Sequence, residues 1–284
     1  MMSQVRQFLP DADGFPIRGL AQTFPDGAVL DAHTHPWGQL VYAVSGVMQV
    51  TTPAAAWLVP PTRAIWVPAS VPHEIRMRGR VAMRTLYFAP ADPDPRLATC
   101  RALEVAPLLR ELIVHITGLH MLDLQSVVQQ HLGGLLLELL AADATAPTSL
   151  PLPVDPRARA FAEAILADPA RSGSLAELAR GSGASLRTLQ RLFVRDTGLT
   201  LEAWRGRTRL QQGVVSLSAG ASVTQTALDA GYQSPSAFIA AFRRAYGVTP
   251  SRYRGRALSA TAPGPGPAAG YRRPGSRRAS RSRA

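Results

Sequence analysis

Two groups of side chains in this sequence have residue types and spacings that suit chemistry. The first lies in residues 185–195, where Arg187, Gln190, Arg191 and Arg195 recur at intervals of three or four residues. Such intervals place side chains on one face of a helix. Arginine and glutamine pair bidentately with the edges of guanine and adenine in the major groove of DNA. The spacing therefore predicts a helix that reads bases.

The second group contains histidines from the first quarter of the chain. His33 and His35 are two residues apart and would point to the same side of a strand, and His73 from a neighbouring strand would add a third imidazole. Three imidazoles suit zinc, nickel, copper or iron and leave a position open for water or a ligand. Gln39 would add a neutral oxygen, which supplies no charge to offset a divalent ion. A metal-free pocket that hydrogen-bonds an organic effector is the alternative.

The helix that carries Arg191 belongs to an internal duplication. A pattern of helix, tight turn and helix occurs in Leu175, Leu178, Ala179, Gly183, Ser185, Leu189 and Phe193, and again in Val223, Thr226, Ala227, Gly231, Ser234, Phe238 and Phe242. In each copy the alanine lets two helices cross closely, the glycine suits a left-handed turn, and the serine caps the next helix. This pattern predicts two helix-turn-helix units, whose second helices would enter the major groove.

The two recognition helices differ in the side chains that they expose. The residues predicted to contact DNA are Arg187, Thr188, Gln190, Arg191 and Arg195 in the first copy, and Gln233, Ser234, Ser236, Ala237, Arg243 and Arg244 in the second. We expect the first helix to read bases and the second mainly to position the protein on phosphates. A helix from Thr200 to about Leu217, roughly 27 Å long, would set the two about one duplex turn apart.

This region resembles the AraC/XylS family of transcription regulators. The resemblance rests on residues 185–200, on Arg209 and Leu210, and on residues 231–254, where Phe238, Phe242, Gly247, Pro250, Tyr253 and Arg254 fall in the spacing of the family signature. It covers roughly the last third of the chain and implies a sequence-specific DNA-binding regulator. Thr226 and Gly213 stand where the family usually has a branched apolar residue and an alanine. We expect a softer core there.

The front half has the pattern of a small antiparallel barrel. Short apolar runs at residues 40–44, 47–51, 57–59, 64–67 and 81–88 alternate with turns rich in proline and glycine, while residues 1 to about 20 read as irregular. Gly27, His33, His35, Gln39 and Gly46 resemble the first motif of cupin barrels, and Pro68, Ser70 and His73 resemble the second. Metal-binding cupins generally carry glutamate where this chain has Gln39. Residues 37–50 and 59–77 resemble a cupin-bearing branch of the AraC-type regulators, which implies a sensor barrel.

Two amphipathic helices should follow the barrel. Their apolar stripes are Val105, Leu108, Leu109, Leu112, Ile113 and Ile116, then Leu124, Val127, Val128, His131, Leu132, Leu135, Leu136, Leu139 and Leu140. The second stripe is longer than the barrel needs to cover its flank, so we expect it to pair with its copy in a homodimer. Packing within its own domain is the alternative. His115, His120 and His131 lie in these segments and are interpreted as surface or interface residues.

These patterns predict an α+β multidomain protein. Its parts are a cupin-like antiparallel β-barrel at residues 1–98, a helical dimerisation segment at 99–143, a semi-rigid proline-rich linker at 144–156, an all-α double helix-turn-helix domain at 157–256, and a disordered basic tail at 257–284.

Charge and cysteine content agree with this division. Residues 1–155 carry 10 arginines and 13 acidic residues, residues 156–254 carry 14 and 6, and residues 255–284 carry 7 arginines and no acid. A basic second half fits nucleic-acid binding. The single Cys100 excludes an intrachain disulfide and favours a reducing compartment. The start does not resemble a signal peptide, and the longest apolar stretch, 132–142, is too short to span a bilayer. We therefore expect a cytoplasmic protein with no membrane partner.

The predicted function is that of a transcription regulator with double-stranded DNA as its partner and a small molecule or metal as its effector. An activator would also contact RNA polymerase. No catalytic residue is assigned, and the candidate cofactor is a divalent transition metal (zinc, nickel or iron). Two alternatives remain: a cupin-type metal-dependent oxygenase, and a constitutive DNA binder with a vestigial barrel. Bound iron would favour the enzyme, and zinc or nickel would favour a sensor.

Overall fold

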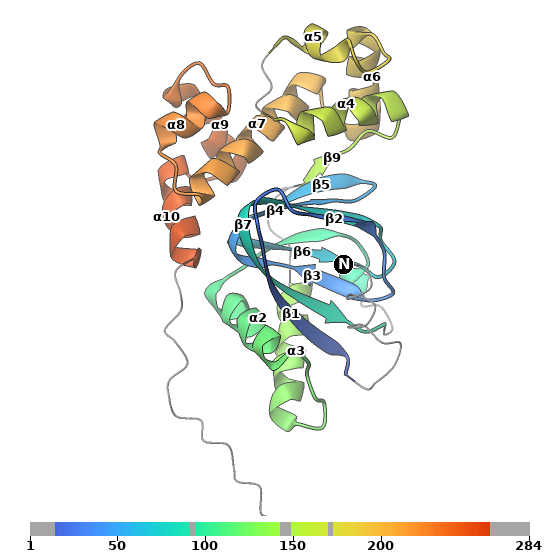
Figure 1. Cartoon of the computed structure of the whole chain (residues 1–284), viewed down its shortest axis with the longest axis vertical. Coiled ribbons are helices and arrows are strands. Elements are labelled where there is room, and N and C mark those ends of the chain that lie inside the picture. Colours follow the sequence, from blue (N-terminus) through green and yellow to red (C-terminus); the bar gives the residue numbers. More distant parts are fainter. Residues whose placement is uncertain (1–14, 91–94, 143–148, 170–172, 262–284) are drawn as a thin grey trace, which may run out of the picture.

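The computed structural model describes residues 15–90, 95–142, 149–169 and 173–261. Figure 1 shows a β-barrel at the centre, two helices below it, and further helices above it that continue down one side. The strands are β1 (Ile17–Phe24), β2 (Val29–His33), β3 (Gly38–Val41), β4 (Ala43–Thr51), β5 (Ala55–Val59), β6 (Arg63–Val67), β7 (His73–Phe88), β8 (Arg101–Glu104) and β9 (Ser149–Pro151). A short 3₁₀ helix, η1 (Pro95–Leu97), precedes β8.

The helices follow in two groups. Below the barrel lie α2 (Pro107–Leu119) and α3 (Val127–Ala141); the second group comprises α4 (Pro156–Ala167), α5 (Leu175–Ala179), α6 (Leu186–Thr197), α7 (Leu201–Ser218), α8 (Val223–Asp229), α9 (Pro235–Tyr246) and α10 (Pro250–Thr261). Among the described residues, no helix has both the length and the apolar composition needed to cross a membrane.

The barrel is built from antiparallel pairs, as predicted. Along one path the strand order is β8-β6-β3-β7-β4-β5-β9, and β1 and β2 also pair with β7. The long strand β7 is central because its first half pairs with β2 and β4, and its second half with β1 and β3. Alternate residues of β7, including Ile75, Met77 and Met83, point inward, while arginines such as Arg76 and Arg78 lie on the other side.

The inside of the barrel is filled by apolar side chains, which we call the lumen cluster. It consists of Phe24, Val41, Ala43, Met48, Val50, Val59, Ile65, Val67, Ile75, Met77, Val81 and Met83, all of them buried. Three of these twelve are methionines, whose unbranched and flexible side chains adapt readily to irregular space. The lumen is therefore a packed core that a ligand enters only by displacing side chains.

Helices α2 and α3 cover one face of the sheet. Leu112 and Ile116 of α2, with Leu136 and Leu140 of α3, join Trp66 and other strand residues in one buried cluster. Close contact is possible because β1 has a glycine where it meets α2. A Cβ atom at Gly19 would lie 2.5 Å from the Cα atom of Thr117.

The predicted stripe on α3 is only half covered. Leu136 and Leu140 are buried, and Leu132 and Leu139 pack at the edge of the same cluster. In contrast, Leu124, Val127, Val128, His131 and Leu135 are exposed. Helix α3 is apolar on nearly all sides, a property of helices that are buried all round. Among the described residues of one chain, nothing apolar covers this exposed face of α3.

The segment before the second group of helices differs from the predicted spacer. Residues 149–151 form β9, which pairs with β5, and Leu150 and Leu152 are buried. The prediction of a linker over 144–156 is therefore corrected for its second half; residues 144–148 lie outside the described part. The barrel also extends beyond residue 98, because β8 pairs with β6. Both differences have one cause, which is that strand pairing depends on partners distant in sequence.

The two helix-turn-helix units form as predicted. Helices α5 and α6 make the first unit, and α8 and α9 make the second. Gly183 and Gly231 take left-handed φ values of 72° and 74° in the turns. The hydroxyl groups of Ser185 and Ser234 accept hydrogen bonds from the amides of Thr188 and Ala237, both at 3.2 Å. Helix α7, 18 residues long, connects the units.

Two flanking helices extend this domain. Asp155 caps α4 by accepting from the amide of Arg157, and Pro156 fills the first turn. At the other end α10 continues to residue 261, past the predicted start of the tail at 257. The basic tail from residue 262 onward lies outside the described residues.

The expected soft core around Gly213 and Thr226 is tightly packed on one side. A Cβ atom at Gly213 would lie 2.8 Å from Cε2 of the fully buried Phe238, so the glycine lets this ring lie against α7. Thr226 is also fully buried, and among the described residues its hydroxyl has no hydrogen-bond partner. Glycine at 213 is therefore a packing requirement, whereas the threonine hydroxyl is unfavourable where it lies.

Candidate functional site

Helix α6 exposes the arginine face that the sequence predicts. Leu189, Leu192 and Phe193 are buried against the rest of the domain, and Arg187 and Arg191 lie on the exposed side. Gln190 is exposed too, and Thr188 is half-buried beside the cap. The N-terminal half of α6 therefore presents two guanidinium groups and an amide to solvent, which is the arrangement that a recognition helix requires.

Arg195 lies at the other end of α6 and forms an ion pair. Its Nε donates to Oδ1 of Asp196 at 2.6 Å. The second oxygen of Asp196 accepts the backbone amides of Val154 and Asp155, both at 3.0 Å. The bond from Arg195, together with these amides, lowers the pKa of Asp196 to about 2. Asp196 therefore connects the end of α6 to Val154 and Asp155, which follow the barrel and precede α4. The sequence pattern did not predict this role.

Helix α9 presents shorter side chains. Gln233, Ser236 and Ala237 are exposed near its start, whereas the Ser234 hydroxyl is engaged in the cap. Arg243 and Arg244 are exposed in its last turn. The contrast between α6 and α9 agrees with the expected division between base reading and phosphate binding. Which side chains touch bases stays a prediction.

The units are fixed to α7 by buried side chains that the sequence analysis did not single out. Trp204 packs against Phe193 and its Nε1 donates to the carbonyl of Pro151 at 2.7 Å. Arg205 is buried, and its Nη2 donates to the carbonyl of Gly173 at 3.0 Å. An arginine within a basic helix gave no signal that it was internal rather than a DNA contact.

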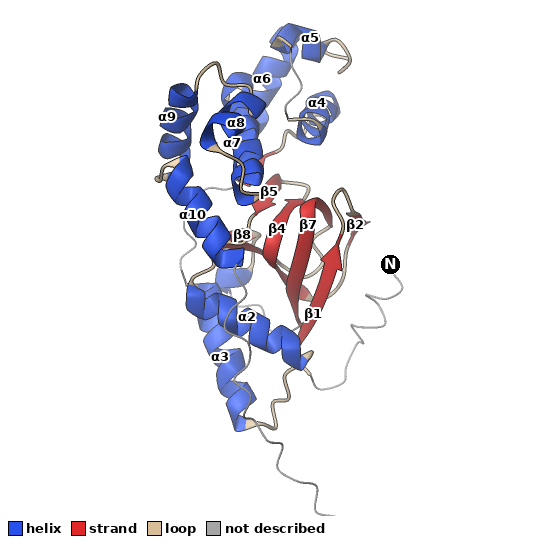
Figure 2. Cartoon of the chain, turned by 60° about the vertical axis from the view of Figure 1, so that its left-hand side comes forward, coloured by secondary structure: helices blue, strands red, loops and turns tan. Residues whose placement is uncertain are grey.

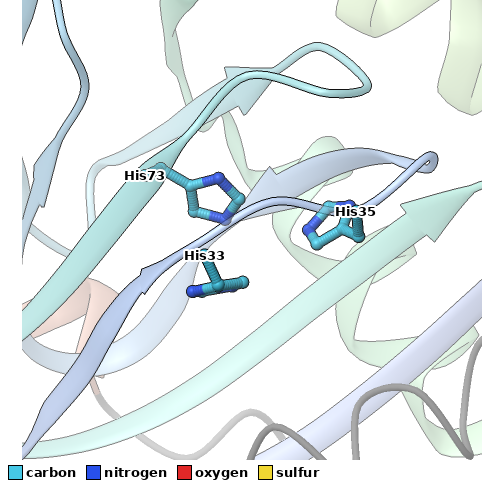
Figure 3. A group of neighbouring side chains, drawn as sticks. All are labelled: His33, His35 and His73. Atoms are coloured by element: carbon cyan, nitrogen blue, oxygen red, sulfur yellow. The ribbon is translucent and has the colours of Figure 1, made fainter.

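The three predicted histidines come together in the barrel. His33 ends β2, His73 begins β7 directly opposite it in the strand pairing, and His35 follows in the next loop. The nitrogens that could hold a metal all lie within 4.8 Å of one another, and the rings point toward a common centre (Figure 3). His115, His120 and His131 are exposed on or beside the helices, as predicted.

Each ring of this cluster has its Nδ1 atom against a backbone carbonyl. The distances are 2.7 Å from His33 to Asp31, 2.7 Å from His35 to Trp37 and 2.9 Å from His73 to Val71. A carbonyl oxygen only accepts, so each of these contacts is a hydrogen bond when Nδ1 carries the proton. Burial lowers the pKa of His73 to about 4 and also lowers that of His35. In a neutral ring of this tautomer Nε2 is an acceptor, as in metal-bound histidines.

Gln39 completes the cluster with an oriented oxygen. Its Nε2 donates to Oγ1 of Thr85 at 2.9 Å, and Thr85 donates to the carbonyl of Leu40. This leaves Oε1 at 2.9 Å from Nε2 of His73 and 3.2 Å from Nε2 of His35. With δ-protonated rings, these short distances join acceptor to acceptor, which a bound cation would relieve. With Nε2 protonated instead, His35 and His73 would donate to Oε1 of Gln39 and close the cluster by hydrogen bonds alone.

The chain joins a duplicated helix-turn-helix domain to an antiparallel barrel with a polar cluster. This combination defines a class of proteins, the DNA-binding regulators with a separate sensor domain. Comparison with known proteins specifies the family. Residues 14–167 match the AraC-like ligand binding domain, and residues 178–256 match a helix-turn-helix domain. The chain belongs to the AraC family of transcription regulators.

Individual relatives agree with this assignment. The HTH-type transcriptional regulator NimR of Escherichia coli K12 is 31% identical over 224 residues, which cover 79% of this chain and 82% of NimR. RipA of Corynebacterium glutamicum is 38% identical over 103 residues, or 36% of this chain and 31% of RipA. Among solved structures, unsaturated fatty acid-bound ToxT of Vibrio cholerae aligns over 87% of this chain and 96% of its own, with 10% identity and a TM-score of 0.35. The two domain matches and the likeness to NimR show that the protein is a DNA-binding transcription regulator with an N-terminal ligand-binding domain.

Proposed function

We propose that this regulator senses its signal at the cluster of His33, His35, Gln39 and His73, and that the cluster holds a divalent transition metal. The observation that carries the proposal is the convergence of three imidazole rings and one amide oxygen, with Nδ1 of each ring against a backbone carbonyl and the amide oriented by Thr85. Imidazole ligands suit zinc, nickel or iron. Because none of the four side chains is anionic, a bound ion would keep its charge and could attract a negatively charged effector.

Metal content tests this proposal. We expect the full chain, purified without a histidine tag, to contain about one metal ion, as three-histidine sites do, and a chelator to change its affinity for DNA. His73→Ala should abolish stoichiometric metal binding. Thr85→Val removes the partner that orients Gln39 and should weaken metal binding about 10–100-fold. Gln39→Glu should strengthen it by adding a negative charge.

His115→Ala is the matched control, since His115 is exposed on α2 and its loss should leave metal content unchanged. If the wild-type chain neither contains metal nor takes up added zinc, nickel or iron, the metal proposal is wrong. The pocket would then be assigned to an organic effector that hydrogen-bonds the same side chains, and thermal-shift screening of small molecules would be the next measurement.

We further infer that the regulator is a homodimer that pairs through α3. The exposed apolar residues Leu124, Val127, Val128 and Leu135 support this, and Val127 and Val128 are 62% and 68% exposed. An apolar face of this kind marks an interaction surface. The partner proposed for it is a second copy, because a symmetric pair would cover both exposed faces with one contact.

Light scattering tests the dimer. At micromolar concentration the wild-type chain should have the mass of two chains, and Val128→Arg should shift it to one, since a buried unpaired charge is strongly unfavourable. Val154→Arg is the control, because Val154 is 82% exposed in a loop away from α3. A wild-type monomer would contradict the proposal, as would a Val128→Arg variant that stays dimeric.

In the cell, we place the regulator in the cytoplasm, bound to double-stranded DNA. RNA polymerase would be a further partner if the regulator activates transcription. The excess of arginine in the second half of the chain supports electrostatic attraction to DNA in addition to specific contacts.

A further inference from the structure

The barrel holds the two helix-turn-helix units by contacts of different quality. Figure 2 shows α10 along the side of the barrel, α7 above it with its lower end near β5, and α4 to α6 higher still. The first unit is attached through the segment that follows β9. Leu150 and Leu152 are buried in one cluster with α4, α6 and Trp204. Trp204 and Asp196 hydrogen-bond the backbone of the same segment. This attachment is extensive and its polar groups are paired.

The second unit is attached through a smaller contact, which we call the Leu58 seam. Val47 and Leu58 of the barrel share a buried cluster with Leu210 and Val214 of α7 and with Tyr253 of α10. A shallow crevice at this contact is lined by Leu58, Pro60, Arg63, Gln211, Val214, Tyr246 and Tyr253. Of the barrel residues that the structure describes, only two belong to this apolar cluster, so the seam offers few side chains to hold the second unit.

One polar atom at the seam opposes its closure. Nη1 of Arg63 on the barrel is buried and has no hydrogen-bond partner among the described residues, whereas the side chains of Thr62 and Ser218 are hydrogen-bonded to Tyr253. Burying a guanidinium nitrogen without a partner is unfavourable, and exposure to water restores its hydrogen bond. A contact with few apolar residues and a buried unpaired nitrogen is suited to open and close.

The same strands connect the seam to the barrel interior. Successive residues of a strand point to opposite faces. Accordingly, Val47 and Leu58 lie in the seam, while their neighbours Met48 and Val59 belong to the lumen cluster and are paired across β4 and β5. A single layer of sheet therefore separates the lumen from α7. Displacement of Met48 or Val59 by a ligand would shift the residues that hold the second unit.

Helix α7 has a point at which the second unit could move. Gly206 lies between Trp204, the last α7 residue in the cluster of the first unit, and Leu210, the first in the cluster of the second. A Cβ atom at Gly206 would have no neighbour within 4 Å. Close packing therefore does not require a glycine at position 206, as it does at position 213. A glycine in the interior of a helix weakens the helix at that point.

We propose that the Leu58 seam is a latch that restrains the second helix-turn-helix unit, and that opening it lets this unit move about Gly206 to engage DNA while the first unit stays fixed. The proposal rests on the barrel being the sensor and on both units binding DNA. It assigns the signal-dependent movement to α8, α9 and α10 and leaves α4 and α6 in place.

The latch itself is tested without DNA, by hydrogen exchange of the full-length protein. Leu58→Ser should accelerate amide exchange in α10 and at the end of α9 and leave α4, α6 and the lumen strands unchanged. Leu119→Ser, on α2 and away from the seam, is the matched control and should accelerate neither. Unchanged exchange in α10 would overturn the proposal. Accelerated exchange throughout the barrel would show unfolding, and Leu58→Ala, a milder truncation, must then reproduce the local effect or the proposal fails.

The second measurement is the affinity for two DNA duplexes. The long duplex is selected from a random pool, and the short duplex keeps only the part of it that the first unit binds. Leu58→Ser should raise affinity for the long duplex about tenfold, because apparent affinity follows the populated fraction of the open state, and should leave the short duplex unaffected. Adding Gly206→Ala, which stiffens α7, should reduce this gain. An equal change on both duplexes would contradict the latch. If the wild-type chain prefers no duplex, the regulator function is at fault, and the exchange experiment still decides on the latch.

Discussion

Replacing Arg191 with alanine should remove most of the regulator's preference for its own DNA site. Arg191 is exposed on α6, opposite the buried Leu192 and Phe193. A bidentate contact between arginine and guanine contributes about 1–3 kcal/mol of discrimination against the wrong base. The measurement is competition between the selected duplex and duplexes changed at one base pair. The Arg191→Ala variant should tolerate changes at one or two adjacent base pairs of the DNA site. Its affinity for non-specific DNA should stay nearly unchanged.

Two further variants separate base reading from simple loss of charge. Arg80→Ala removes one exposed positive charge from the barrel and should leave both affinity and preference unaltered. Arg243→Ala, in the last turn of α9, should weaken binding to all duplexes alike and reduce the slope of the salt dependence by about one. If Arg191→Ala behaves like Arg243→Ala, then α6 binds phosphates and the predicted division between the two helices is wrong.

Gly46→Ala should destabilise the barrel strongly, whereas Gly27→Ala should be tolerated. Both glycines belong to the cupin-like motif and both have left-handed backbones, with φ of 78° and 73°. A Cβ atom at Gly46 would lie 2.4 Å from the carbonyl oxygen of Arg80 and 2.9 Å from the Cα atom of Val81, while one at Gly27 would meet nothing within 4 Å. The backbone neighbours of Gly46 belong to β7 and cannot rotate away.

The left-handed conformation alone costs a residue with a Cβ about 1–2 kcal/mol, which is the loss expected for Gly27→Ala. Gly46→Ala also displaces β4 from β7. Its loss of unfolding free energy should therefore exceed that of Gly27→Ala by at least the effect of overpacking a core, about 1–3 kcal/mol. Urea unfolding followed by tryptophan fluorescence would measure both. Equal losses for the two variants would show that the β4–β7 contact is more adaptable than the geometry indicates.

Local pattern was sufficient to predict the helix-turn-helix units. Their helix ends depend on residues close in sequence, such as Ser185 with Thr188 and the glycines at 183 and 231, so spacing alone places them. The strands were predicted less completely. β1 was missed in part because its apolar residues, Ile17, Leu20, Ala21 and Phe24, do not alternate, and the first half of β7 because its buried residues are separated by charged ones and form no continuous apolar run. β9 was missed because a proline-rich segment resembles a spacer, and its pairing with β5 involves residues almost 100 positions away.

The candidate sites show the same limit. The spacing of His33 and His35 predicted that both would reach one pocket with His73. The orientation of Gln39 depends on Thr85, which lies on a distant part of β7, and no local pattern announces it. Asp196, Arg205 and Leu58 likewise act through partners from other elements. Sequence spacing identifies side chains that can bind, whereas the residues that orient them follow from strand register and domain contacts.

The strand β9 also bears on how the protein can be divided for study. It occupies the free side of β5, which would otherwise present unpaired backbone amides and carbonyls at the edge of the sheet. Exposed edges of this kind recruit strands from other molecules. A barrel truncated before residue 149 would expose the edge of β5 that β9 covers in the intact chain. Self-association of such a fragment would then report aggregation along β5, and only a chain that retains residues 149–152 can reveal the natural pairing of the sensor domain.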